Sequence, residues 1–166
     1  MEKPSETILS KLTELGINYS LLIHEPIYTM DAGRAIAQRL GAEPCKCLLL
    51  CTRHKEYYMV LLSGNSNLLV KDISKQIGCS HLAFASHEDL DKLLHTKQGA
   101  VSPLGLLFDT DNRVNLLIDT EIVESEYMIC HPNDNTCSLR FRTTDILEVY
   151  LPANNHSEYQ IIKGLS

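Results

Sequence analysis

The chain has 166 residues, 44% of them hydrophobic, and a formal net charge of −6 at pH 7. This length supports one domain with a buried core, and the negative charge argues against a protein that grips long nucleic acid through its phosphates, because that mode needs a basic surface. No stretch reaches the ~18 apolar residues of a membrane span and no apolar signal segment opens the chain, so we expect a soluble, cytoplasmic protein.

The N-terminal half contains alternating helix and strand signals. Apolar residues every three or four positions predict helices, and apolar residues at alternate positions predict strands. The expected elements are a helix capped by Ser5 and ended by Gly16, a strand over 17–23, a helix capped by Thr29 and ended by Gly41, and two strands over 45–52 and 57–62 joined by the polar turn 53–56.

The C-terminal half continues in the same mixed manner. Its expected elements are a helix over 70–77, a short strand over 81–85, a helix opened by a Ser86–Asp89 capping box, strands over 114–118, 127–130 and 138–142, and a last helix from Thr144 to Tyr150. Because helices and strands intermix without a strict βαβ rhythm, we expect an α+β fold. The whole of 1–166 should form a single domain, with a mixed, curled, barrel-like β-sheet covered by helices.

The segment "EPCKCLLLC", residues 43–51, places Lys46 between two cysteines. Alternation along a strand sends Lys46 and the cysteines to opposite faces, which argues against a lysine-activated thiol. Without a secretory signal the six cysteines are interpreted as reduced thiols. A metal or thiol site remains an alternative, using Cys45, Cys47, Cys130, Cys137 and His131. A lysine among leucines either extends to solvent at the strand end or is placed for chemistry.

Two further segments are ambiguous when each is taken alone. The loop "GAVSP", residues 99–103, either turns backbone N–H groups toward a ligand oxygen or is a plain turn. His131 in "CHPND" either serves a site or is an ordinary polar residue at a strand end. The alternatives stay open on these residues alone.

In combination and in order, these segments resemble a known family. The motifs are "HEPIYTMDA" at 24–32, Lys46 opening an apolar strand, "GAVSPLGLL" at 99–107, "LLID" at 116–119 and "HPNDNT" at 131–136. They resemble the YbaK-like family of aminoacyl-tRNA deacylases, in particular the freestanding prolyl-tRNA editing branch related to the insertion domain of prolyl-tRNA synthetases. The resemblance covers nearly the whole chain.

The resemblance implies an enzyme that hydrolyses the ester between a wrong amino acid and the 3' end of a tRNA, typically alanine on proline tRNA. It implies mischarged tRNA as the partner, no DNA, no membrane, no cofactor and no metal, and it leaves a homodimer open. The family's essential lysine falls on Lys46. Its glycine-to-proline loop falls on Gly99, Ala100, Val101, Ser102 and Pro103, and its His-Pro element falls on His131 and Pro132.

The chemistry expected of these residues is the stabilisation of an oxyanion. Lys46 would polarise the acyl carbonyl or nearby ribose and phosphate oxygens, and N–H groups of residues 100–102 would add donors. The sequence shows no clear general base, so a ribose hydroxyl of the substrate is expected to help activate water. Tyr28, Met30, Leu48 and His131 are the expected lining of a pocket that admits alanine and excludes proline by size.

Two departures concern the acyl specificity. Members of the alanine-specific branch commonly carry asparagine after the lysine, where this chain has Cys47, and the acidic pair of the early helix is kept only in part, as Met30 and Asp31. Alanine, cysteine, serine or another acyl group therefore stay open as substrates. A non-catalytic module that binds aminoacyl-tRNA or an amino acid on the same fold is the alternative function.

Overall fold

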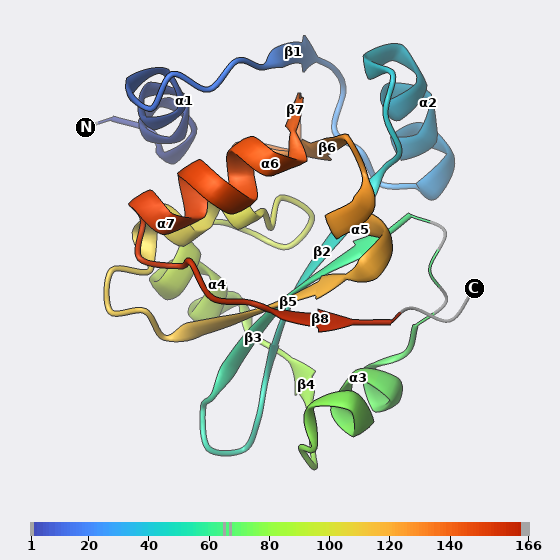
Figure 1. Ribbon diagram of the computed structural model, residues 1–166, viewed down its shortest axis with the longest axis vertical. Helices are drawn as coiled ribbons and strands as arrows, with labels where there is room; N and C mark the ends of the chain where they lie inside the picture. Colours follow the sequence, from blue (N-terminus) through green and yellow to red (C-terminus); the bar gives the residue numbers. More distant parts are fainter. Residues whose placement is uncertain (1, 65, 67, 164–166) are drawn as a thin grey trace.

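A hairpin of strands β2 (Cys45–Cys51) and β3 (Tyr57–Ser63) forms the centre of the protein (Figure 1). The computed structural model describes residues 2–64, 66 and 68–163, and of Met30 it describes only the backbone. The hairpin belongs to a sheet with the strand order β4-β2-β3-β5-β8. β4 (Ala83–Phe84) pairs antiparallel with β2, whereas β5 (Val114–Asp119) and β8 (Gln160–Ile162) extend the sheet by parallel pairing.

A second, smaller sheet is antiparallel throughout. Its order is β1 (Ser20–Ile23), β7 (Cys137–Arg142), β6 (Tyr127–Cys130). The mixed α+β architecture is thus confirmed, but the expected curled, barrel-like sheet is wrong, since the described strands form two open sheets. Closure requires strand partners at both edges, and here the larger sheet ends in strands of two and three residues.

Helices cover both sheets. They are α1 (Pro4–Glu14), α2 (Met30–Leu40), α3 (Val70–Ile77), α4 (His87–Leu94), the 3-10 helix η1 (Pro103–Phe108) and α5 (Thr120–Glu124), followed by the continuous run of α6 (Thr143–Asp145), the π-helix η2 (Ile146–Tyr150) and α7 (Leu151–Ala153). Figure 1 shows α1, β1 and α2 at one end of the molecule and α3 with β4 at the other. No helix within the described residues is long and apolar enough to cross a membrane.

Helix boundaries with clear capping signals are predicted correctly. Thr29 caps α2 by accepting a hydrogen bond of 3.1 Å from the Ala32 N–H, and Gly41 ends it in the left-handed conformation. Ser86 caps α4 in the same way. Ser5 is wrong as a cap, because α1 already begins at Pro4, a residue whose fixed φ suits the first helical position.

The apolar residues of the hairpin are buried on both faces. Leu49, Met59 and Leu61 belong to the main core under α1, α4 and the C-terminal helical run, whereas Leu50 and Val60 belong to a second cluster shared with α3. Burial on both faces explains the continuous apolar sequence of these strands. A third cluster, Ala37, Leu40 and Ile129, packs α2 on the small sheet. The first residues of β2 therefore lie where the two sheets and α2 meet.

Candidate functional site

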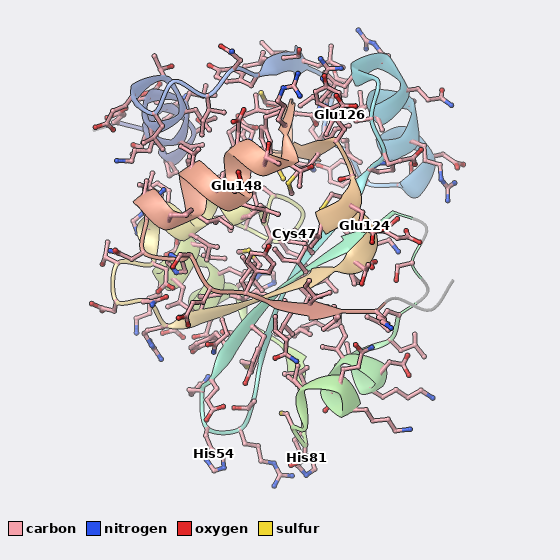
Figure 2. The ribbon with its side chains drawn as sticks, viewed as in Figure 1. Cys47, His54, His81, Glu124, Glu126 and Glu148 are labelled. Carbon is pink, nitrogen blue, oxygen red and sulfur yellow. The ribbon has the colours of Figure 1, made fainter. Side chains whose placement is uncertain are left out.

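A cavity of about 150 Å³ lies at this junction. Its wall comes from residues 27–29, α2, the start of β2, the 99–103 loop, the end of β6 and the start of β7. The lining residues are Ile27, Thr29, Gly33, Ile36, Ala37, Pro44, Cys45, Lys46, Cys47, Val101, Ile129, Cys130, His131 and Ser138. Figure 2 shows Cys47 in the middle of the molecule, far from His54 and His81, which lie at the tip of the β2–β3 hairpin and beside β4. Those two histidines are thereby separated from the cavity.

Lys46 is the one lysine among the described residues that line the cavity. It pairs with Leu62 in the hairpin, is half-buried, and its Nζ donates a hydrogen bond of 3.3 Å to the carbonyl oxygen of Ser66. Among the described residues no carboxylate forms an ion pair with it. Among the described residues, the Lys46 ammonium is therefore held by a neutral carbonyl and by no counter-ion.

Two cysteines of the cavity wall, Cys47 and Cys130, are neutral thiols. Burial, followed by the neighbouring Cys45, raises the pKa of Cys47 well above its ordinary value. A hydrogen bond with Cys45 and then burial do the same to the pKa of Cys130. Within the described part of the chain no three His, Cys, Asp or Glu side chains are grouped as metal ligands. The alternation along β2 is as expected, and Cys45, Cys47 and Cys51 pack against the main core.

The loop of residues 99–103 has an internal hydrogen-bond structure. Gly99 has φ +92°, a conformation that favours glycine. The Ala100 N–H donates to the carbonyl of Lys97 at 3.1 Å, so this expected donor is already used. Ser102 caps η1 by accepting from the Leu104 N–H, and Pro103 begins that helix. In the described chain, the N–H groups of Val101 and Ser102 bond to no protein acceptor, and of the loop only Val101 lines the cavity.

The "HPNDNT" segment holds the cavity walls together. The Asn133 side chain donates to the carbonyl of Leu94 at 2.7 Å, at the end of α4. The Asn135 side chain donates to the carbonyl of Ile27 at 3.0 Å. The motif that precedes α2 and the motif that follows β6 are therefore joined directly in space.

His131 lines the cavity with a neutral imidazole. Burial is the largest cause that lowers its pKa, against the opposing effect of its hydrogen bond to Cys137. Nδ1 donates to the Cys137 carbonyl at 2.8 Å. The ring is thus fixed at the end of β6, immediately before Pro132.

Two other residues expected in the pocket, Tyr28 and Leu48, lie elsewhere. Tyr28 does not line the cavity: it is 86% exposed, between the lining residues Ile27 and Thr29. Leu48 packs in the second core cluster on the opposite face of β2. Met30 begins α2, and its side chain lies outside the described residues.

Two polar residues near His131 were missed by the sequence analysis. Ser138 on β7 and His24 after β1 form a hydrogen bond of 2.8 Å. The pair is separated by 114 positions in the chain, so no local pattern indicates it. His24 is the first residue of the motif "HEPIYTMDA", but the sequence assigned no role to it.

A half-buried lysine, loop N–H groups without a protein acceptor among the described residues and a small, partly open cavity are the kinds of groups that stabilise an oxyanion in acyl transfer. The model of the aminoacyl-tRNA editing domain matches residues 24–149, and the chain therefore belongs to this family. It is an aminoacyl-tRNA deacylase, a hydrolase.

Comparisons with particular proteins agree with the family. The prolyl-tRNA editing protein ProX of Acetoanaerobium sticklandii is 31% identical over 153 residues, which cover 92% of this chain and 93% of ProX. The prolyl-tRNA synthetase associated domain-containing protein 1 of Danio rerio is 24% identical, covering 88% of this chain and 80% of that protein. A crystal structure described as a candidate trans-editing enzyme for prolyl tRNA synthetase shares the fold, with TM-score 0.73 and 16% identity over 100% of this chain and 99% of that one.

Proposed function

We propose that this protein is a trans-editing hydrolase that cleaves the aminoacyl ester of mischarged tRNA, with Ala-tRNA(Pro) as its preferred substrate. The observation that carries the proposal is Lys46, half-buried at a small cavity and held by the Ser66 carbonyl alone among the described residues. The printed names of ProX and of the zebrafish protein support proline tRNA as the carrier. Residues 1–166 act as one editing domain, in the cytoplasm where tRNA is charged.

In the proposed reaction, Lys46 and the 99–103 loop act on the same developing charge. The acyl carbonyl oxygen is directed toward the Lys46 ammonium and the N–H group of Val101, the loop residue that lines the cavity. Water attacks the carbonyl carbon, and the ribose oxygen leaves. Fixed donors in a site that excludes water stabilise the oxyanion without reorganising, and one such donor is typically worth about 2.7 to 4 kcal/mol in the barrier.

Activation of the attacking water is assigned to the substrate. No Asp or Glu is among the described residues that line the cavity, so a carboxylate base is not at hand there. A hydroxyl of the terminal ribose is close to the scissile ester in any bound pose, and we propose that it assists the water.

Selection of the acyl group follows from the size of the cavity. Ile129, Val101 and the α2 residue Ala37 narrow a space of about 150 Å³. We propose that these walls exclude a rigid pyrrolidine ring and admit a methyl side chain. Exclusion by size discriminates more strongly than one or two lost methylene contacts would.

Deacylation assays test the proposal. Purified protein without added metal should hydrolyse Ala-tRNA(Pro) and spare Pro-tRNA(Pro), and Lys46→Ala should lower the rate by about 10²- to 10³-fold. Lys92→Ala, at an exposed position on α4, is the matched control and should keep full activity. Full activity of Lys46→Ala would overturn the mechanism. Saturable tRNA binding without turnover on a panel of mischarged tRNAs would favour a binding module instead.

A further inference from the structure

A directed chain of hydrogen bonds ends at the cavity. Nδ1 of His131 lies 2.8 Å from the carbonyl oxygen of Cys137. A carbonyl only accepts, so Nδ1 carries the proton. Nε2 of this neutral ring then keeps a free lone pair. Among the described residues Nε2 has no hydrogen-bond partner, although His131 lines the cavity.

Ser138 and His24 fix this arrangement from behind. Nδ1 of His24 lies 2.7 Å from the Glu25 carbonyl, so in the neutral ring it carries the proton and leaves Nε2 as an acceptor. The Ser138 hydroxyl, 2.8 Å away, donates to that Nε2. Its oxygen then presents a lone pair toward Nδ1 of His131, at 3.4 Å. Every donor in the chain faces an acceptor, and this determines both the tautomer and the ring plane of His131.

An aminoacyl ester brings two polar groups into such a cavity. The carbonyl suits the Lys46 cation, but the α-ammonium group is repelled by it and needs an acceptor. No described residue of the lining is a carboxylate. The Thr29 hydroxyl already accepts from the Ala32 N–H at 3.1 Å, and the Pro44 carbonyl already accepts from the Gly64 N–H at 2.9 Å. Among the side-chain acceptors of the described lining, the imidazole lone pair of His131 is the one that has no such partner.

We propose that Nε2 of His131 accepts a hydrogen bond from the free α-ammonium group of the aminoacyl ester, and that Ser138 and His24 are positioning residues that hold the ring in the required tautomer. The inference rests on the proposed function and narrows its substrate class. The enzyme acts on esters with an unblocked α-amine, and it discriminates against N-acylated aminoacyl-tRNA, whose amide nitrogen carries no charge.

The test compares Ala-tRNA(Pro) with N-acetyl-Ala-tRNA(Pro). The wild-type protein should hydrolyse the free-amine ester with a kcat/KM about 10- to 100-fold higher, the range expected for a hydrogen bond to a charged group. In His131→Asn the side-chain amide can still donate to the Cys137 carbonyl, but the Nε2 acceptor is gone. This variant should lose activity on the free-amine ester alone, so that its discrimination ratio approaches one.

Variants of the positioning residues give the second readout. Ser138→Ala and His24→Phe should lower the discrimination ratio, and His24→Gln, whose amide oxygen can accept from Ser138, should restore part of it. Ser157→Ala, at an exposed position, is the control and should leave the ratio unchanged. A merely structural role would change the two rates equally and leave the ratio constant.

Three outcomes decide against the inference. Equal wild-type hydrolysis of both esters would overturn it while leaving the proposed function intact. Equal loss on both esters in His131→Asn would assign the histidine to water activation instead. Absence of hydrolysis of either ester would overturn the proposed function and the inference together. If a variant fails to fold by circular dichroism, binding of the nonhydrolysable 3'-alanylamido-adenosine and its N-acetyl form to the wild-type protein provides the same comparison.

Discussion

The side-chain amide of Asn135 donates a hydrogen bond of 3.0 Å to the backbone carbonyl of Ile27. This contact joins the loop that follows β6 to the segment that precedes α2, two walls of the same cavity. The Oδ1 atom of Asn135 is buried and has no hydrogen-bond partner among the described residues. The amide is therefore retained at some energetic cost, which is consistent with a role in shaping the site.

Asn135→Ala tests this contact. The substitution leaves the Ile27 carbonyl without its partner but also removes an unsatisfied buried oxygen, so the free energy of unfolding should fall by only about 1 kcal/mol. Because the two walls of the cavity are then joined less firmly, KM for the aminoacyl-tRNA should rise by a larger factor than kcat falls. Steady-state deacylation with Asn18→Ala, an exposed site, as the control measures the effect. Unchanged KM together with a large loss of stability would mean that the contact serves folding alone.

Gly33→Ala should change stability and activity in opposite directions. Gly33 lies within α2 and lines the cavity, and an added Cβ would contact only the Ile27 side chain, at 3.8 Å. Because alanine favours the helix by about 1 kcal/mol over glycine, the melting temperature should rise. The methyl group also narrows the cavity, so kcat/KM should fall, and more for Ser-tRNA than for Ala-tRNA.

Ala35→Gly is the matched control for this prediction. Ala35 lies in the same helix at an exposed position outside the lining. It should lower the melting temperature and leave the order of acyl preference unchanged. An unaltered acyl preference in Gly33→Ala would show that this wall does not contact the acyl group.

The sequence predicted those elements whose signals are local. Helices α2 and α3 and the β2–β3 hairpin agree with expectation because caps, turn residues and apolar alternation act over a few positions. β1 was predicted as a strand with an apolar side, yet Leu21 and Ile23 are 43% and 76% exposed. The reason is that Leu22 faces the cluster between α2 and the small sheet, so its neighbours Leu21 and Ile23 point to the opposite, exposed face; the tertiary packing that selects this face is not encoded locally.

The candidate site was predictable to a similar extent. Lys46 and the 99–103 loop were singled out because a lysine in an apolar strand and a Gly-to-Pro loop are locally unusual. The contacts of Asn133, Asn135 and Ser138 join segments that are distant in sequence. Only the fold brings these groups together, so composition and spacing gave no indication of them.

The thiols of Cys47 and Cys130 should be chemically unreactive. Because the pKa values of Cys47 and Cys130 are raised, few thiolates form at pH 7.5, and the thiolate is the reactive species. Iodoacetamide should modify Cys79, whose thiol makes an exposed contact with the Ser80 carbonyl, before Cys47 and Cys130, as followed by peptide mass spectrometry. In concentrated urea all six cysteines should react. Rapid alkylation of Cys47 in the folded protein would instead support the thiol hypothesis.

A buried pair far from the cavity should govern acid stability. The Nε2 atom of His156 donates to Oδ2 of Asp109 at 2.9 Å, and the carboxylate also accepts from the backbone N–H groups of Arg113 and Val114. Burial alone would raise the pKa of Asp109, but the hydrogen bond from His156 and those from the backbone outweigh it, and the pKa is lowered.

The sign of the pH dependence follows from this lowered pKa. The stabilisation by Asp109 is fully present above its unfolded pKa of about 3.9 and is lost as pH falls through the lower folded value. At pH 7 the free energy of unfolding of Asp109→Asn should therefore be lower than that of the wild type by about 3 kcal/mol. As the pH falls below the pKa of the unfolded carboxyl group, the variant should lose less of this free energy than the wild type does.

Urea titrations from pH 7 down to about 2 measure both effects. Asp111→Asn, in the same turn but exposed, should stay within about 0.5 kcal/mol of the wild type. Parallel acid profiles of Asp109→Asn and the wild type would show that other carboxylates control acid unfolding. Because the pair lies outside the cavity lining, the acyl preference of folded Asp109→Asn at pH 7 should equal that of the wild type, which separates this structural role from the chemistry at Lys46.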